Sequence, residues 1–210
     1  MARNASLRPI LFGAALALIS CCGSAYAAVG SYVGNLGGLA PISAQGFEGA
    51  YAKDGTLPRG FSSVFVAPVS VISGQDKWLD DLAPSDYRPV QDYLQRRLTD
   101  ALSKKFSIAD KPGPGVLIVA ASFTELRPNK PTMTELGKNP GEDYARSFGI
   151  GRGGIQIDIR DGGSGALLAA FVDHEQGDPI NVNTNLRIQW GDVEQFSRDW
   201  ASELAEALAH

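Results

Sequence analysis

The chain has 210 residues, a formal net charge of −4 and only two cysteines, Cys21 and Cys22. A chain of this length buries enough apolar surface to fold as one domain without disulfides. The excess of acidic residues and the scattered lysines and arginines argue against a nucleic-acid partner, because phosphate binding needs clustered cations.

The first 27 residues have the features of an export signal. Arg3 and Arg8 give a positive start, residues 10–20 form an apolar run, and residues 25–27 (AYA) supply small side chains at the spacing that signal peptidase needs. Within this segment, residues 18–21 (LISC) resemble the lipobox of bacterial lipoproteins, whose cysteine receives a diacylglycerol before cleavage. We therefore expect export, with Cys21 as the lipidated residue.

Two cleavage positions remain open. Cleavage before Cys21 gives a lipid-modified N-terminus, whereas cleavage before Ala28 gives a soluble periplasmic protein without any cysteine. Residues 1–27 contain two arginines and no acidic residue, so their removal changes the net charge to about −6. No later apolar stretch approaches the roughly 20 residues that span a bilayer, so membrane contact is expected through a lipid.

The residues that follow the signal are expected to form a tether and then the start of a domain. Residues 28–60 are rich in Gly and lack periodicity, which is typical of a flexible linker. Residues 61–210 are expected to be one folded domain. Its first strand is predicted at residues 63–72, where Pro68 requires an edge position or a bulge because it cannot donate a ladder hydrogen bond.

A helix is predicted next, from a cap at Ser85 to about Lys105, with Pro89 in its first turn. Its apolar residues recur at helical spacing, and oppositely charged pairs lie outside them. This pattern predicts an amphipathic helix with one face to bury.

The second half of the domain is expected to supply three strands and a helix. Residues 116–123 are apolar on both faces, which predicts a central strand. A long polar insertion, residues 127–149, separates it from a hairpin at residues 155–175, whose first strand alternates strictly. A last helix is predicted near Asp192, which forms a capping box with Gln195.

The order β-α-β-β-β-α predicts an α+β fold, with a mostly antiparallel β-sheet and two amphipathic helices packed on one face. The expected core is made of apolar side chains from every one of these elements. They are Val64, Val66, Leu94, Leu98, Leu117, Val119, Ile155, Ile157, Ile159, Leu168, Trp200 and Leu204.

Three motifs together resemble a known family. They are residues 110–117 (DKPGPGVL), residues 161–169 (DGGSGALLA) with Asp173 after them, and residues 190–192 (WGD) before the last helix. In order and spacing they are similar to bacterial lipoproteins grouped as domain of unknown function 3313, over roughly residues 46–208. The resemblance implies a lipoprotein signal, which the Cys21 segment fits, and a fold. It implies no activity, because none is established for the family.

Two patterns with known catalytic or cofactor associations favour structural interpretations. Residues 149–154 (GIGRGG) match G-x-G-x-x-G, but a strand follows them where a dinucleotide site needs a helix, so we interpret them as a mobile entry to that strand. His174, between Asp173 and Glu175, would have to serve any serine triad or metal site. Alternation along a strand places His174 on the face opposite its neighbours, which favours a polar cluster at the sheet edge.

One group of loop acids is compatible with sugar hydrolysis. Asp76, Asp80 and Asp81 surround Trp78, and a pair of carboxylates is what such an enzyme uses. Unpaired loop acids are far commoner, so we expect no catalytic pair here. Trp78 itself is the best candidate for an exposed aromatic contact.

The insertion is the other candidate for a contact surface. It is longer than the usual connection of about 4–6 residues, and it holds Met133, Tyr144 and Phe148 among polar residues. A disordered insertion that binds nothing is the alternative.

We therefore expect a non-catalytic cell-envelope lipoprotein, facing the periplasm from the inner leaflet of the outer membrane and binding another, unknown envelope component. No cofactor and no metal are expected. The alternative is a small soluble periplasmic hydrolase or ligand-binding protein. Convergence of carboxylates or of His174 in a pocket would favour that alternative.

Overall fold

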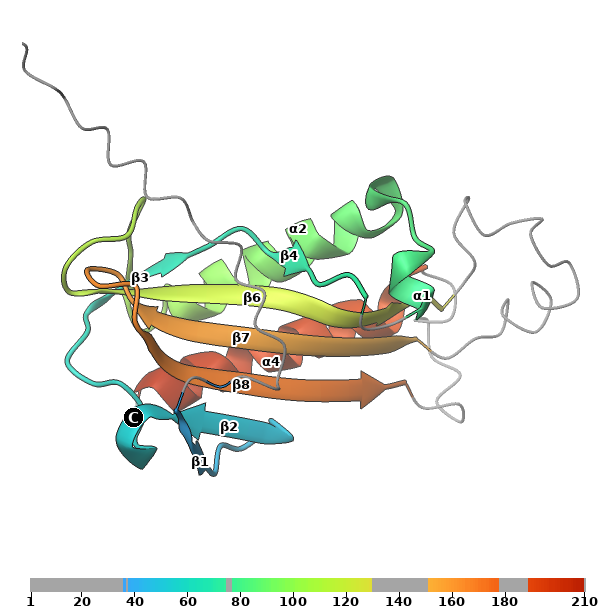
Figure 1. Ribbon diagram of the computed structural model, residues 1–210. Coiled ribbons are helices and arrows are strands. Elements are labelled where there is room, and N and C mark those ends of the chain that lie inside the picture. The colour runs from blue at the N-terminus through green and yellow to red at the C-terminus, as the bar shows by residue number, and fades with distance from the viewer. Residues whose placement is uncertain (1–35, 37, 75–76, 130–150, 178–188, 210) are drawn as a thin grey trace, which may run out of the picture.

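The computed structural model describes residues 36, 38–74, 77–129, 151–177 and 189–209. In this part of the chain, one sheet of eight strands lies in front of two long helices (Figure 1). The strands are β1 (Ala40–Ile42), β2 (Gly49–Ala52), β3 (Ser63–Val66), β4 (Ser70–Val71), β5 (Ser107–Ile108), β6 (Val116–Arg127), β7 (Arg152–Asp161) and β8 (Leu167–Gln176). The helices are η1 (Lys53–Gly55), α1 (Lys77–Asp80), α2 (Pro84–Leu102) and α4 (Gly191–Ala209).

The sheet has the order β1-β2-β8-β7-β6-β3-β5, and β4 also pairs with β6. The pairs β6/β7, β7/β8, β2/β8 and β1/β2 are antiparallel, whereas β3 and β4 run parallel to β6, and β5 runs parallel to β3. The predicted α+β class is confirmed, with a mostly antiparallel sheet and both long helices on one face (Figure 1). The hairpin predicted at residues 155–175 is confirmed as β7 and β8.

The strand predicted at residues 63–72 is interrupted at Pro68, as the missing N–H requires. Two glutamines of α2 satisfy the backbone around the interruption. The Gln95 side chain accepts from the Val69 N–H at 2.9 Å, and the Gln91 amide donates to the Val69 carbonyl at 3.0 Å. These hydrogen bonds attach the segment between β3 and β4 to α2.

Helix α2 buries one side, on which Val90, Leu94, Leu98 and Leu102 follow one another at intervals of four residues. The predicted cap at Ser85 is wrong. The helix begins at Pro84, and the carboxylate of Asp86 accepts from the N–H of Ala83 at 3.1 Å. A proline suits the first helical position because no N–H is needed there, whereas Pro89 consequently lies beyond the first turn.

Helix α4 begins where the sequence predicts, and it buries Phe196, Trp200, Leu204 and Leu208. The predicted capping box is wrong, because the carboxylate of Asp192 accepts from other elements and the Gln195 amide donates to Asp199 at 2.9 Å. The predicted core residues are all buried except Leu168, which is partly buried and packs against the core. Among the described residues, no helix has both the length and the apolar character needed to cross a membrane.

The range expected as a tether contains part of the sheet. Within residues 28–60, the strands β1 and β2 extend the sheet beyond β8. Ala50 and Ala52 are buried, and the Phe47 ring lies 4.9 Å from the ring of Phe171. The Gly-rich composition does not predict these strands, because β1 depends on pairing with β2, and β2 depends on pairing with β8, which lies far away in the sequence.

Candidate functional site

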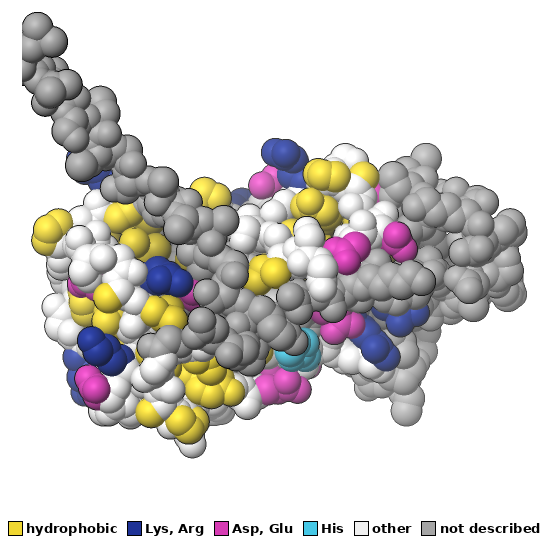
Figure 2. Space-filling view, viewed as in Figure 1, with side chains coloured by type: hydrophobic (Ala, Val, Ile, Leu, Met, Phe, Trp, Pro, Cys, Tyr) yellow, Lys and Arg dark blue, Asp and Glu magenta, His cyan; other side chains and the backbone are white. Residues whose placement is uncertain are grey.

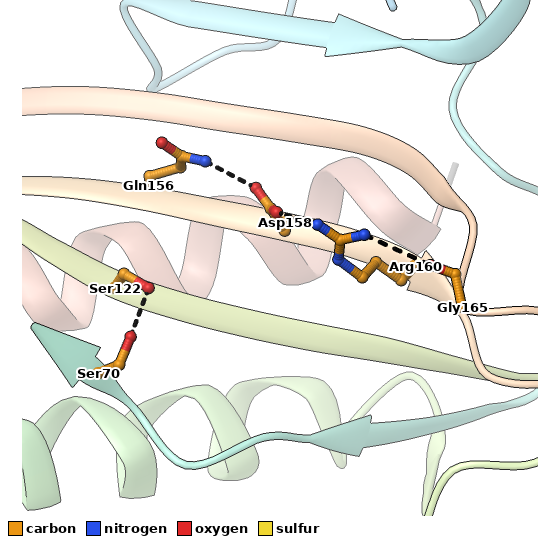
Figure 3. Close-up of polar contacts among 6 residues, drawn as sticks. All are labelled: Ser70, Ser122, Gln156, Asp158, Arg160 and Gly165. Atoms are coloured by element: carbon orange, nitrogen blue, oxygen red, sulfur yellow. Dashed lines mark hydrogen bonds and ion pairs between the residues drawn. The ribbon is translucent and has the colours of Figure 1, made fainter. Parts of the chain in front are cut away.

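The sheet face away from α2 and α4 carries a row of polar side chains on β7 (Figure 3). Gln156, Asp158 and Arg160 alternate along the strand and therefore share this face. Asp158 is 1% exposed, and its carboxylate accepts from the Gln156 amide at 2.9 Å and from the Arg160 guanidinium at 2.8 Å. The guanidinium also donates to the carbonyl of Gly165 at 3.4 Å. A buried carboxylate needs such partners, and the row thereby fixes β7 against its hairpin turn.

A second polar contact on this face joins the edge strand to the centre of the sheet. The hydroxyls of Ser70 on β4 and Ser122 on β6 lie 2.6 Å apart (Figure 3). Two further polar atoms on this face, Thr124 Oγ1 and Arg160 Nε, are buried without a hydrogen-bond partner in the described part of the chain. The hydrogen bonds of this face join β4 to β6 and β7 to its hairpin turn, so they have a structural role.

His174 and Asp173 point to opposite faces of β8, as the alternation predicts. Asp173 is 3% exposed, and its carboxylate accepts from the Trp200 indole N–H at 2.6 Å and from the Glu48 N–H at 3.1 Å. His174 lies at the surface, with Nδ1 3.1 Å from the Glu48 carboxylate. Asp173 thus fixes α4 and the residue before β2 to the sheet. His174 contributes a surface pair of the kind that stabilises by about 0–1 kcal/mol at most.

Two neighbouring glutamates have raised pKa values. Burial raises the pKa of Glu203 on α4, and the negative charges of Asp199 and Asp173 raise it further. Burial likewise raises the pKa of Glu175, with Asp173 as the largest charge contribution. Within the described ranges, no group of three or more His, Cys, Asp or Glu side chains has an arrangement that could hold a metal ion. Because folding raises their pKa values, the ionised forms of Glu203 and Glu175 destabilise the fold.

A third polar cluster lies where β6 ends and β7 begins. Asn129, which follows β6, donates to the carboxylate of Asp192 at 2.6 Å, and the Gly151 N–H donates to the same oxygen at 2.9 Å. The side-chain amide oxygen Oδ1 of Asn129 accepts in return from the Asp192 backbone N–H at 3.0 Å. Asp192 thus holds the end of β6 and the start of β7 to the first turn of α4.

The residues predicted to contact a partner are not placed by the structure. Cys21, Met133, Tyr144 and Phe148 lie outside the described residues. Trp78 belongs to α1, but its side chain is also outside the described part. Of the three acidic residues near Trp78, the structure describes two. Asp80 accepts from the Gly74 N–H at 2.7 Å and Asp81 is exposed, whereas Asp76 is outside the described residues.

The glycines of the G-x-G-x-x-G match have a structural role that sequence reasoning missed. Gly153 and Gly154 lie inside β7, so the interpretation of these residues as a mobile entry is wrong. A β-carbon on Gly153 would lie 3.0 Å from the Trp200 ring, and one on Gly154 would lie 2.6 Å from Thr124 Oγ1. Gly177, after β8, would bring a β-carbon within 2.0 Å of the Asp192 carboxylate. The sequence signal available was adjacent glycines entering a strongly alternating strand, which indicates close packing across a sheet.

Comparisons with known proteins give a family and distant structural likenesses. The crystallised PelC dodecamer from Paraburkholderia phytofirmans aligns with 11% identity over 76% of this chain and 94% of its own, with a TM-score of 0.42. The hypothetical protein CT253 from Chlamydia trachomatis aligns with 10% identity over 71% and 98%, with a TM-score of 0.42. A minor lipoprotein from Acinetobacter baumannii aligns with 13% identity over 72% and 93%, with a TM-score of 0.32.

At these identities and TM-scores, the likenesses carry no argument about function. No curated protein matches the chain. The family model described as "Protein of unknown function (DUF3313)" matches residues 31–204, which include every strand of the sheet and most of α4. The chain therefore belongs to the DUF3313 family, as its motifs at residues 110–117, 161–169 and 190–192 predict.

Proposed function

We propose that this protein is a non-catalytic cell-envelope lipoprotein that faces the periplasm and binds another envelope component. Its anchor in this proposal is a lipid on Cys21, in the inner leaflet of the outer membrane. Several acyl chains, each buried methylene contributing about 0.8 kcal/mol, would hold the protein in a way that salt does not reverse.

The observation that carries the non-catalytic role is the geometry around His174. A histidine that acts as a general base needs an acid to orient it and a nucleophile within hydrogen-bond reach. Here the flanking Asp173 faces the other side of the sheet and accepts from Trp200. The exposed His174 has the Glu48 carboxylate as an acid partner, but it forms no hydrogen bond to a hydroxyl or thiol of the described residues. The buried Asp158 is engaged by Gln156 and Arg160. These carboxylates stabilise the fold, which supports a binding role over a catalytic one.

The anchor is tested by fractionation of two matched variants. Wild-type protein and Cys22→Ala should remain with the membrane fraction after a high-salt wash, because both keep the lipidated position. Cys21→Ala should appear in the periplasmic fraction, cut before Ala28. Wild-type protein found wholly in the periplasmic fraction would contradict the proposal, and so would a Cys21→Ala protein that stays with the membrane.

The partner surface in this proposal comprises Trp78 and the insertion, residues 127–149. Deleting residues 130–143 should leave the melting temperature within a few degrees of wild type and abolish co-purification of the partner from detergent-solubilised envelopes. Substitution of the same residues by a Gly-Ser linker of equal length separates loss of sequence from loss of length. If either variant still captures every wild-type partner, the contact lies elsewhere.

A further inference from the structure

A basic hollow lies at the end of the sandwich where α4 terminates. It has a volume of about 560 Å³, and its lining includes Arg59, Lys104 and Lys105, with no Asp or Glu among the lining residues that the structure describes. These cations come from two segments, the loop before β3 and the turn after α2, so the sequence gives no sign of the cluster. The chain as a whole has a net charge of −4, whereas the three cations make the lining of this hollow locally positive.

The same hollow has an apolar wall. Phe61 and Phe106 are partly buried against the main core, and Leu208 of α4 and the buried Leu117 complete the lining. Figure 2 views the molecule from the sheet side, and at this end, on its left, hydrophobic side chains reach the surface beside basic and acidic ones. The hollow therefore offers both positive charge and apolar surface to one ligand.

The basic side chains are available to a ligand. Arg59 and Lys104 are exposed and form no ion pair with another residue of the described chain. Lys105 pairs with Glu206 at 3.0 Å, with the two side chains 36% and 57% exposed. An exposed pair of this kind contributes about 0–1 kcal/mol, so a stronger anion displaces Glu206 at little cost.

The C-terminal end of α2 explains only part of this positive charge. Lysines after a helix stabilise its C-terminal carbonyl groups, and Lys104 and Lys105 follow α2 directly. Arg59 has no such role, because it comes from the loop between η1 and β3. Arg59 also borders a second hollow, of about 680 Å³, whose lining includes Ile42, Leu57 and Ala207. Arg59 thus lines both hollows.

We propose that the basic hollow binds the headgroup of an anionic phospholipid. In this proposal Arg59 and Lys104 contact the phosphate, for which a guanidinium supplies two parallel N–H donors, and the apolar lining takes the adjoining glycerol and first acyl carbons. A free phosphate ion would leave that lining unused. The proposal goes beyond the function proposed above, because a non-covalent lipid site at this end requires neither Cys21 nor the insertion.

The test uses the full-length chain carrying Cys21→Ala, so that no acyl group of the protein contributes to binding. Its co-flotation is measured with vesicles of equimolar phosphatidylglycerol and phosphatidylcholine, and with vesicles of phosphatidylcholine alone. The hollow variant is Arg59→Gln with Lys104→Gln. The matched control is Arg88→Gln with Arg96→Gln, which removes the same charge from exposed positions on α2.

We expect binding to the anionic vesicles only, about 30-fold weaker in the hollow variant and nearly unchanged in the control. Each cation that contacts an anionic membrane surface strengthens binding by about 5-fold, so the loss of two gives about 30-fold. Equal losses in the two variants would show a non-specific charge effect and overturn the proposal. Absence of wild-type binding, or equal binding to phosphatidylcholine alone, would also overturn it. Amide shifts at Arg59 and Lys104 on addition of inorganic phosphate, without vesicle binding, would replace the lipid by a small anion.

Discussion

Trp200 should be the most sensitive position in the last helix. The side chain is 1% exposed and lies between the rings of Phe123 and Phe196, with centroid distances of 6.4 and 6.0 Å. Trp200→Ala removes this packing, which typically costs about 3–5 kcal/mol. It also removes the N–H that Asp173 accepts, and a hydrogen bond to a charged group contributes about 1.5–3 kcal/mol. The combined loss approaches the whole stability of a typical domain, about 5–15 kcal/mol, so little folded protein should remain.

Two conservative substitutions separate packing from hydrogen bonding. Trp200→Phe keeps an aromatic ring but leaves the Asp173 carboxylate without its indole donor, so it should cost about 2 kcal/mol or more. Trp190→Phe is the matched control, because its buried indole donates at 3.0 Å to a neutral acceptor, the Asp86 carbonyl, and should cost less. Urea unfolding followed by far-ultraviolet circular dichroism gives the costs of Trp200→Phe and Trp190→Phe and shows whether Trp200→Ala still unfolds cooperatively. A Trp200→Phe cost no larger than that of Trp190→Phe would refute the role of Asp173, and an unchanged Trp200→Ala midpoint would show that α4 is not docked.

Two other substitutions test the polar clusters. Folding raises the pKa of Glu203, so its ionised form weakens the fold above the raised pKa, and this penalty disappears below the ordinary pKa of a glutamate. Glu203→Gln should therefore raise the melting temperature at pH 7 and have no effect at pH 3; equal effects at both values would contradict the cause given. Gly177→Ala would place a β-carbon 2.0 Å from the Asp192 carboxylate and should lower the melting temperature by several degrees, whereas Gly113→Ala, whose β-carbon would meet no described atom within 4 Å beyond its two chain neighbours, should not. Equal melting temperatures for the two alanine variants would show that Asp192 moves freely.

The parts of the fold that depend on local pattern could be predicted from the sequence. Strict alternation at residues 155–160 identifies β7, and apolar residues four apart identify the buried side of α2. The helix caps could not be predicted in this way, because Asp192 bonds with Asn129, 63 residues away, instead of with its own helix. A capping motif in a sequence specifies a possible partner, and tertiary structure can supply a better one.

The candidate sites also combine features that a local sequence pattern predicts with features that only the tertiary structure reveals. Alternation places His174 opposite Asp173, but no local pattern reveals that Trp200 donates to that carboxylate, since the pair forms only when α4 packs on the sheet. The basic hollow is equally non-local, because Arg59 and Lys104 are far apart in the chain. Scattered cations in a sequence therefore do not exclude a cluster in the fold.

The most direct test of the proposed lipoprotein is the intact mass of wild-type protein extracted from the membrane fraction with detergent. We expect a chain that begins at Cys21 and carries the mass of a diacylglyceryl group together with an amide-linked acyl chain. Cys22→Ala should give the same modification. An unmodified chain that begins at Ala28 would contradict the lipid anchor and would identify the protein as a soluble periplasmic one.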